Sequence, residues 1–239
     1  MRRIGARLLA FAVVIAAAIT PAVAEQVDVE LVLAADGSGS IDDDELALQR
    51  RGYAEAVTSR DVLDVIRGGL IGKIALAYVE WGGPGSQHVI VDWMVIEDET
   101  SAQAFADALV SRPRAAVGYN SISAAIDFSV GLIESNAYEG LKMVIDVSGD
   151  GPNIGGRPVQ FARDDAVAKG ITINGLVIAG PGGVVRRVAN EPLDEHYRRD
   201  VIGGPGAFVM TVERTDAFPT VVRRKMVLEI ADGGTTVRQ

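Results

Sequence analysis

Beyond position 25, apolar residues form short strand-like runs separated by segments with helical spacing. Residues 27–35 begin with Val27, Val29 and Leu31 in alternation and continue as an unbroken apolar run, which predicts a buried central strand of a covered sheet. Further strands are predicted at residues 73–81, 86–93, 141–148, 171–178 and 207–212. The sequence Gly-Gly-Pro-Gly at 82–85 predicts a hairpin between the second and third runs, and therefore one antiparallel edge.

Helical patterns follow most of these runs. The acidic residues from Asp42 to Glu45 supply a cap and a favourable first turn for a helix that extends to about Thr58 or beyond. Further helices are predicted at residues 101–110, 121–135, 158–169, 194–201 and 217–231. Regular alternation of strands and helices predicts an α/β fold, with a mostly parallel central sheet, one antiparallel edge strand and helices on both faces. We expect one domain over residues 25–239.

The first 24 residues have the pattern of a secretory signal peptide. A basic stretch from Met1 to Arg7 precedes an apolar run from Leu8 to Ile19, and small residues lie at the expected cleavage site before Glu25. The apolar run is shorter than the roughly 20 residues that a membrane-spanning helix needs. We therefore expect a bacterial protein that is periplasmic or secreted, without stable membrane insertion after cleavage.

Composition narrows the classes of partner. The chain has no Cys, which excludes disulfides, thiolate zinc sites and a cysteine nucleophile. Cleavage would remove three arginines and no acid, taking Lys+Arg from 23 to 20 against 32 Asp+Glu, a net charge of −12. Such a surface repels nucleic acid and anionic lipid, so we expect neither as a partner. Nothing in the sequence pattern indicates the oligomeric state.

Oxygen-bearing side chains gather where predicted strands end or helices begin. One group alternates in a glycine-loosened turn after the first strand, a polar pair precedes the helix at 121–135, and a carboxylate follows the strand at 141–148. Ligands of parallel α/β sheets bind beyond the carboxyl ends of the strands, and hard divalent cations take oxygen ligands. The residues predicted to hold a cation are Asp36, Ser38, Ser40, Asn120, Ser121 and Asp150.

These three segments resemble the metal-ion-dependent adhesion site of von Willebrand factor type A domains. The resemblance rests on Asp36-x-Ser38-x-Ser40, on the polar pair before the helix and on Asp150-Gly151, and it extends over roughly residues 27–230. It is nearest to an uncharacterised branch of exported bacterial proteins. It implies that Ser38 and Ser40 ligate the cation directly, and that Asp36 and Asp150 hold it directly or through water. The implied cation is Mg²⁺, with Mn²⁺ or Ca²⁺ as alternatives.

The middle segment departs from the family pattern. Where the family usually has Thr, this chain has Asn120, with Ser121 beside it. The carbonyl oxygen of an Asn side chain can ligate Mg²⁺ or Ca²⁺, and the Ser121 hydroxyl can replace it after a small shift. The sequence leaves open which of the two residues serves.

The resulting functional hypothesis is a binding module and not an enzyme. A cation held by hydroxyls and few carboxylates keeps residual positive charge, so an acidic residue of a partner protein or ligand would fill its open position. One alternative is a metal-free interaction scaffold, in which the Asp and Ser side chains only cap a turn. The other is a serine hydrolase using Ser38, although G-x-S-x-G is absent and only His88 and His196 could act as base.

Other chemistries fit the sequence less well. Gly37-Ser38-Gly39 lacks the third glycine of a dinucleotide-binding loop, and an aspartyl-phosphate phosphatase would need an acid where Ser38 stands. The two histidines are interpreted as surface or structural residues, and Asp146 as a structural carboxylate. The basic run Arg223-Arg224-Lys225 is interpreted as a solvated helix face.

Overall fold

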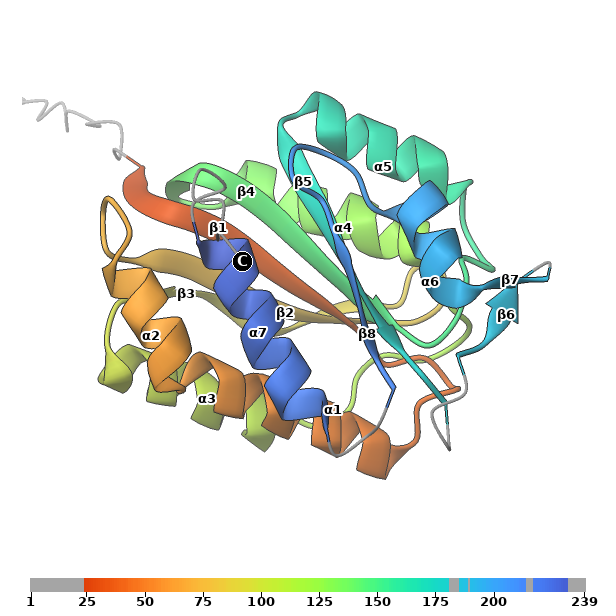
Figure 1. Cartoon of the computed structure of the whole chain (residues 1–239), viewed down its shortest axis with the longest axis horizontal. Helices are drawn as coiled ribbons and strands as arrows, with labels where there is room; N and C mark the ends of the chain where they lie inside the picture. Colours follow the sequence, from red (N-terminus) through yellow and green to blue (C-terminus); the bar gives the residue numbers. More distant parts are fainter. Residues whose placement is uncertain (1–23, 181–184, 189, 214–216, 232–239) are drawn as a thin grey trace, which may run out of the picture.

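A six-stranded sheet lies between two layers of helices (Figure 1). The computed structural model describes residues 24–180, 185–188, 190–213 and 217–231, so the expected signal peptide lies outside the described residues apart from Ala24. The strands of the sheet are β1 (Glu25–Asp36), β2 (Ile74–Trp81), β3 (Gln87–Ile96), β4 (Tyr138–Gly149), β5 (Ile171–Ile178) and β8 (Val209–Val212). The helices are α1 (Asp43–Val57), α2 (Arg60–Arg67), α3 (Glu99–Ser111), α4 (Ile122–Ser135), α5 (Val159–Ala168), α6 (Leu193–His196) and α7 (Phe218–Ile230), with a π-helical turn, η2 (Tyr197–Val201), after α6.

The strand order is β3-β2-β1-β4-β5-β8, and only the β2–β3 pair is antiparallel. The predicted fold class is therefore confirmed, including the antiparallel edge strand. β1 and β4 are central, and β4 is also longer at its start than the pattern predicted, because its first residues pair with the start of β1.

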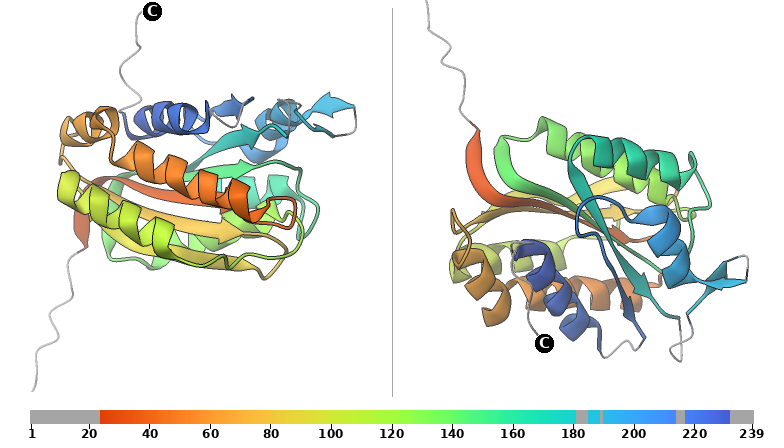
Figure 2. Two further views of the ribbon diagram at one scale, coloured as in Figure 1. Left: turned by 90° about the horizontal axis from the view of Figure 1, so that it is seen from below. Right: turned by 45° about the horizontal axis from the view of Figure 1, so that its top comes forward.

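Helices cover both faces of the sheet, as two further views show (Figure 2), and each face has its own apolar core. One core joins the sheet to α1, α2, α3 and α7, and the other joins it to α4, α5, α6 and η2. In β1, Leu31 and Leu33 belong to the first core, while Val32 and Ala34 belong to the second. Burial on both faces is the reason that the sequence of this strand is continuously apolar.

The helix predicted to extend to about Thr58 or beyond is α1, and a separate helix, α2, follows it. Asp42 caps α1 and forms a capping box with Glu45, as the acidic run predicted. The helix ends at Val57, and the hydroxyl of Ser59 then accepts a hydrogen bond from the amide of Val62 to begin α2. Ser59 is therefore a second N-cap, and it begins a new helix within a stretch whose apolar pattern alone is compatible with one continuous helix.

The segment before α6 contains a two-stranded ribbon that the sequence pattern did not predict. Its strands are β6 (Arg187–Val188) and β7 (Glu191–Pro192). Asn190 in its turn has a φ of 73°, a conformation that Asn tolerates better than most residues. The ribbon lies at one end of the molecule, beside α6 (Figure 1).

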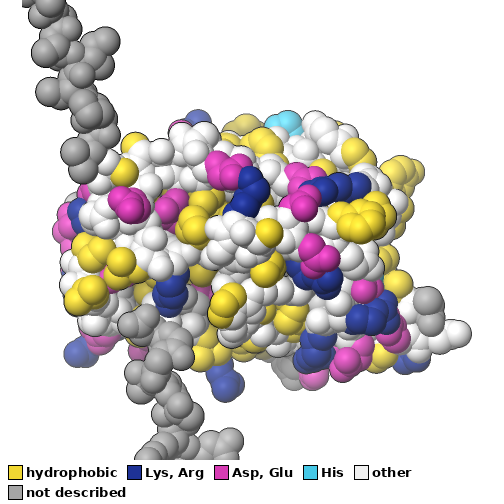
Figure 3. All heavy atoms as spheres, turned by 90° about the horizontal axis from the view of Figure 1, so that it is seen from above, with side chains coloured by type: hydrophobic (Ala, Val, Ile, Leu, Met, Phe, Trp, Pro, Cys, Tyr) yellow, Lys and Arg dark blue, Asp and Glu magenta, His cyan; other side chains and the backbone are white. Residues whose placement is uncertain are grey.

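Charged side chains of opposite sign lie next to each other on the surface seen in Figure 3. Among the ion pairs of the described residues, Arg157 pairs with both Asp127 and Asp165. Exposed pairs of this kind contribute little to stability. Within the described residues, the helices are all too short or too polar to cross a membrane.

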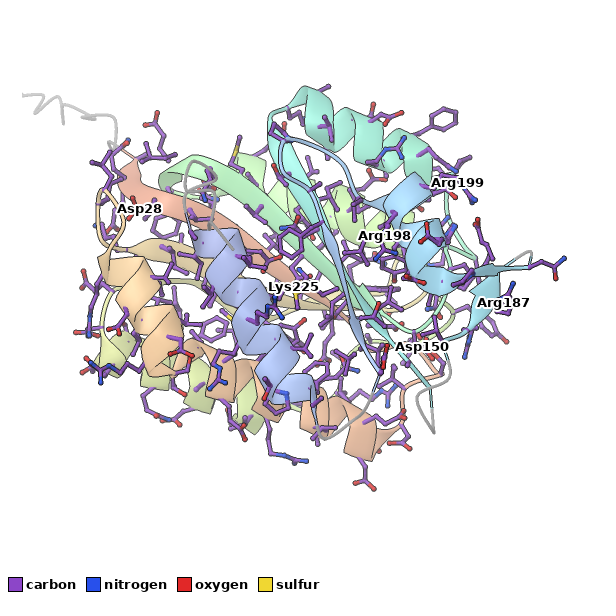
Figure 4. All side chains as sticks on the ribbon, viewed as in Figure 1. Asp28, Asp150, Arg187, Arg198, Arg199 and Lys225 are labelled. Carbon is purple, nitrogen blue, oxygen red and sulfur yellow. The ribbon has the colours of Figure 1, made fainter. Side chains whose placement is uncertain are left out.

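The interpretation of Lys225 as part of a solvated face is wrong. Its side chain is fully buried beneath α7, where the ammonium lies 2.6 Å from Asp146 of β4 and also pairs with Glu229 (Figure 4). Burial alone would lower the pKa of Lys225, but the two carboxylates outweigh that effect and raise it. The basic run indicated a solvated face because the sequence does not reveal that α7 packs over the buried carboxylate of Asp146 in β4.

Replacing Lys225 tests this buried cluster. Lys225→Met leaves two buried carboxylates without their cation, and we expect a loss of about 3–5 kcal/mol in the free energy of unfolding near pH 8. Arg224→Met on the same helix is exposed and should change it by less than about 0.5 kcal/mol. Chemical denaturation of both variants measures the difference.

The loss should shrink in acid. Burial raises the pKa of Glu229 to about 7 even though Lys225 acts to lower it, so removing the ammonium raises this pKa further and the folded variant takes up more protons than the folded wild type as the pH falls. The stability of Lys225→Met should therefore rise, relative to the wild type, as the pH falls from 8 to 5. Equal stability of the two methionine variants at pH 8 would contradict the assignment.

Candidate metal centre

The candidate site lies at the carboxyl edge of the two central strands. β1 and β4 are parallel, and their register places Ala35 opposite Ser148. Asp36 therefore ends β1 beside Gly149. Asp150, which is labelled in Figure 4, follows Gly149 directly. The absence of a side chain at Gly149 matters, because a Cβ there would lie 2.8 Å from the hydroxyl of Tyr197 and 3.2 Å from Oδ2 of Asp36.

The loop after β1 is held in one conformation by hydrogen bonds. Asp36 Oδ1 accepts a 2.8 Å bond from the amide of Ser38, as in an Asx turn. From outside the loop, Arg114 Nη2 lies 2.7–2.9 Å from the carbonyl oxygens of Gly37, Ser38 and Ile41. Arg114 thus fixes the backbone that carries both serines.

Five of the six predicted residues are linked by polar contacts of 3.1 Å or less. Asn120 donates its side-chain amide to Asp36 Oδ2 at 3.0 Å and accepts from the hydroxyl of Ser38 at 3.1 Å. Ser38 and Ser40 bring their Oγ atoms to 3.1 Å, and Ser40 donates to Asp150 Oδ1 at 2.9 Å. Three loops that are distant in sequence therefore bring their oxygens to one place.

Ser121, the sixth predicted residue, is turned away from this cluster. Its hydroxyl donates to the carbonyl of Gly155 at 2.9 Å, although Ser121 occupies the N-cap of α4. Asn120 is fixed by its own backbone, because its carbonyl accepts bonds from the amides of Ile154 and Gly155. The loop after Asp150 thus orients Asn120 into the cluster and engages Ser121 elsewhere.

The two carboxylates of the cluster differ in burial and in their partners. Asp36 is fully buried, and burial raises its pKa from 3.8 to about 7 against the lowering effect of the hydrogen bonds from Ser38. Its side chain meets hydrogen-bond donors but no basic side chain among the described residues. Asp150 is less buried, and its Oδ2 accepts a 3.3 Å bond from Arg186.

The spacing of the oxygens suits an octahedral cation. Bonds of about 2.1 Å to Mg²⁺ place neighbouring ligands about 3 Å apart. The contacts Ser38 Oγ–Ser40 Oγ, Ser38 Oγ–Asn120 Oδ1 and Ser40 Oγ–Asp150 Oδ1 measure 3.1, 3.1 and 2.9 Å. The donor set contains carboxylate, hydroxyl and amide oxygens, which is the chemistry of a hard cation.

Two arginines near the cluster were not identified from the sequence as parts of this site. Arg186 donates to Asp150 from the segment before β6. Arg114 lies 77 positions along the chain from Gly37, the first residue whose carbonyl it contacts, and no local sequence pattern indicates that contact. Both depend on contacts between distant loops, which spacing along the chain does not encode.

Solved structures support the fold. The chain resembles a von Willebrand factor type A structure from Catenulispora acidiphila (TM-score 0.61, 15% identity, covering 84% of this chain and 42% of that one). It resembles the pilus adhesin SpaC from Lactobacillus rhamnosus GG (TM-score 0.59, 13% identity, 87% and 31%). It also resembles proximal thread matrix protein 1 from the mussel byssus, with a zinc-occupied MIDAS motif (TM-score 0.59, 13% identity, 87% and 46%).

These comparisons show a von Willebrand factor type A-like fold. The chain spans less than half the length of each of these three proteins. No curated protein matches the sequence significantly. Residues 26–234 match the family model described as "Protein of unknown function (DUF1194)", and the chain belongs to that family.

Proposed function

We propose that this protein is an exported binding module that recognises a carboxylate of a protein partner or ligand through a divalent cation. The ligands would be Asp36, Ser38, Ser40, Asn120 and Asp150. The observation that carries the proposal is the convergence of these oxygens, from three loops, at separations of 2.9–3.1 Å. Mg²⁺ is the proposed cation, because the donors are all oxygens and two are neutral hydroxyls.

The charge of the chain makes the cation a local attractor. A mature protein with a net charge of −12 repels an acidic partner over most of its surface. A divalent cation beside Asp36 and Asp150 would offset two carboxylates, and its remaining coordination position would accept a third. An incoming carboxylate would then gain a direct bond at that point and nowhere else on this surface.

Export is part of the proposal. Cleavage before Glu25 would leave the fold intact, because β1 begins at that residue and its amide bonds the carbonyl of Ala137. Similar structures include a pilus adhesin and a byssus matrix protein, whose names describe surface or extracellular roles. The mature protein would act as a single domain over residues 25–239, in the periplasm or outside the cell.

The alternative of a serine hydrolase has less support. The hydroxyl of Ser38 bonds Asn120 and Ser40 among the described residues, and neither can act as general base. His88 bonds Ser86 on the antiparallel edge of the sheet, and His196 lies 2.9 Å from Asp200. A metal-free scaffold would keep the same loop conformation, so titration with metal is the deciding experiment.

Calorimetric titration of the purified protein with Mg²⁺ tests the metal site. We expect one equivalent to bind, and Asp150→Ala to weaken binding by at least about tenfold because a charged ligand is lost. Ser38→Ala should also weaken it. Asp44→Ala, an exposed acid in the first turn of α1, should leave it unchanged. If the wild-type protein binds neither Mg²⁺ nor Mn²⁺ nor Ca²⁺, the metal-free scaffold is correct.

Carboxylate recognition can be measured separately on the Mn²⁺-loaded protein. Bound Mn²⁺ with an open position exchanges water and speeds the relaxation of water protons. A short capped peptide with one aspartate should displace that water and slow the relaxation, whereas the same peptide with asparagine should do so much less. Equal responses to the two peptides would contradict carboxylate recognition while leaving metal binding intact.

Arg114 should affect the site without contacting the cation. Arg114→Met removes the donor to three loop carbonyls, and we expect a loss of about 1–3 kcal/mol in the free energy of unfolding together with several-fold weaker Mg²⁺ binding. Arg112→Met, whose side chain is exposed nearby, is the matched control. Chemical denaturation of both variants gives the free energy of unfolding, and calorimetry gives the affinity for Mg²⁺. An unchanged affinity in Arg114→Met would show that the metal site does not depend on the hydrogen bonds from Arg114 to the loop.

A further inference from the structure

A second group of potential metal ligands lies at the ribbon and the π-helical turn. Glu191 belongs to β7, His196 ends α6, and Asp200 lies in η2. One ligand atom from each residue lies within 4.8 Å of the others, and Nδ1 of His196 is 2.9 Å from Oδ2 of Asp200. None of these residues belongs to the site described above.

The imidazole of His196 is the observation that distinguishes this group from an ordinary acidic cluster. Its side chain is 90% buried, and neither ring nitrogen has a hydrogen-bond partner of acceptable geometry among the described residues. Buried polar groups are nearly always satisfied, so an unpartnered ring beside two carboxylates points to a missing ligand. The ring also packs edge-on against Tyr197, which limits its rotation.

Arg199 occupies the place of a cation in this group. Its guanidinium pairs with both Glu191 and Asp200, and it lowers the pKa of the Asp200 carboxyl. The Arg199 side chain is 57% exposed, so it can swing into solvent without leaving a buried cavity. Figure 4 shows Arg198 and Arg199 on the same short segment, close to the ribbon that carries Arg187. Two carboxylates and one imidazole would then remain for a divalent ion.

We propose that Glu191, His196 and Asp200 bind a Zn²⁺-class cation, in competition with the guanidinium of Arg199. Imidazole nitrogen with carboxylate oxygens selects Zn²⁺, Ni²⁺ or Co²⁺ over Mg²⁺, unlike the oxygen-only cluster at Asp36. Three protein ligands plus water complete a tetrahedral zinc, whose ligand atoms lie about 3.4 Å apart. Glu191 is only partly buried on a two-residue strand, so it can close the remaining distance.

Zinc titration in excess Mg²⁺ tests the proposal independently of the first site. The Asp150→Ala variant, with the oxygen cluster disabled, is titrated with Zn²⁺ near neutral pH by calorimetry. We expect one equivalent of Zn²⁺ to bind, and His196→Gln in the same background to weaken the affinity by at least about tenfold. Circular dichroism confirms that the His196→Gln variant is folded, and a Co²⁺ absorption spectrum typical of tetrahedral coordination should be lost with it.

Arg199 provides a test of opposite sign. Arg199→Gln removes the competing cation, so the affinity for Zn²⁺ should rise several-fold. Arg198→Gln is the matched control, because Arg198 pairs with Asp194 and Glu195 on the same segment and should leave the affinity unchanged. Zinc binding that is insensitive to His196→Gln, or no zinc binding in Arg199→Gln, overturns the proposal. Neither result depends on whether Mg²⁺ binds at Asp36.

Discussion

The parallel pairing of β1 with β4 is the constraint on which the candidate site depends. Its register sets Ala35 opposite Ser148, and so the two acidic loops leave the sheet side by side. Side chains on β1 alternate between two apolar cores, which makes the register costly to change. A slip of one residue would exchange the two faces and bury Leu31 and Leu33 in the wrong layer. Packing far from the site therefore fixes the position of Asp36.

Buried carboxylates lie at two places in this protein, and their electrostatic partners differ. Beneath α7, Asp146 and Glu229 share a lysine supplied by the chain itself. At the sheet edge, Asp36 is equally buried but receives only neutral donors, from the amide of Ser38 and the side chain of Asn120. A buried carboxylate without a cation is stable chiefly in its protonated form. The chain thus supplies its own cation to the cluster beneath α7, whereas at Asp36 the proposed divalent ion would take that role.

Local signals made much of the fold predictable, and also which polar side chains meet at the sheet edge. Asp36, Ser38, Ser40 and Asp150 were identifiable because strand ends and alternate spacing bring such residues to one edge. The sequence did not reveal that Asn120, and not Ser121, joins this cluster, because a shift of one residue at the start of α4 would exchange the directions of the two side chains. The buried position of Lys225 was also hidden, since its partner lies 79 positions earlier on β4. Contacts between distant elements determine what sequence periodicity leaves open.

Tyr197 separates the two ligand clusters. It follows His196 in the chain, its ring is fully buried, and its hydroxyl lies 3.4 Å from the carbonyl of Gly151, next to Asp150. The same hydroxyl borders the gap at Gly149 that faces Asp36. A rearrangement of this phenol by either cluster would be transmitted to the other, and thermodynamic linkage makes such an influence equal in both directions. Tyr197 thus offers a physical route by which a cation at one of the two proposed sites would influence binding at the other.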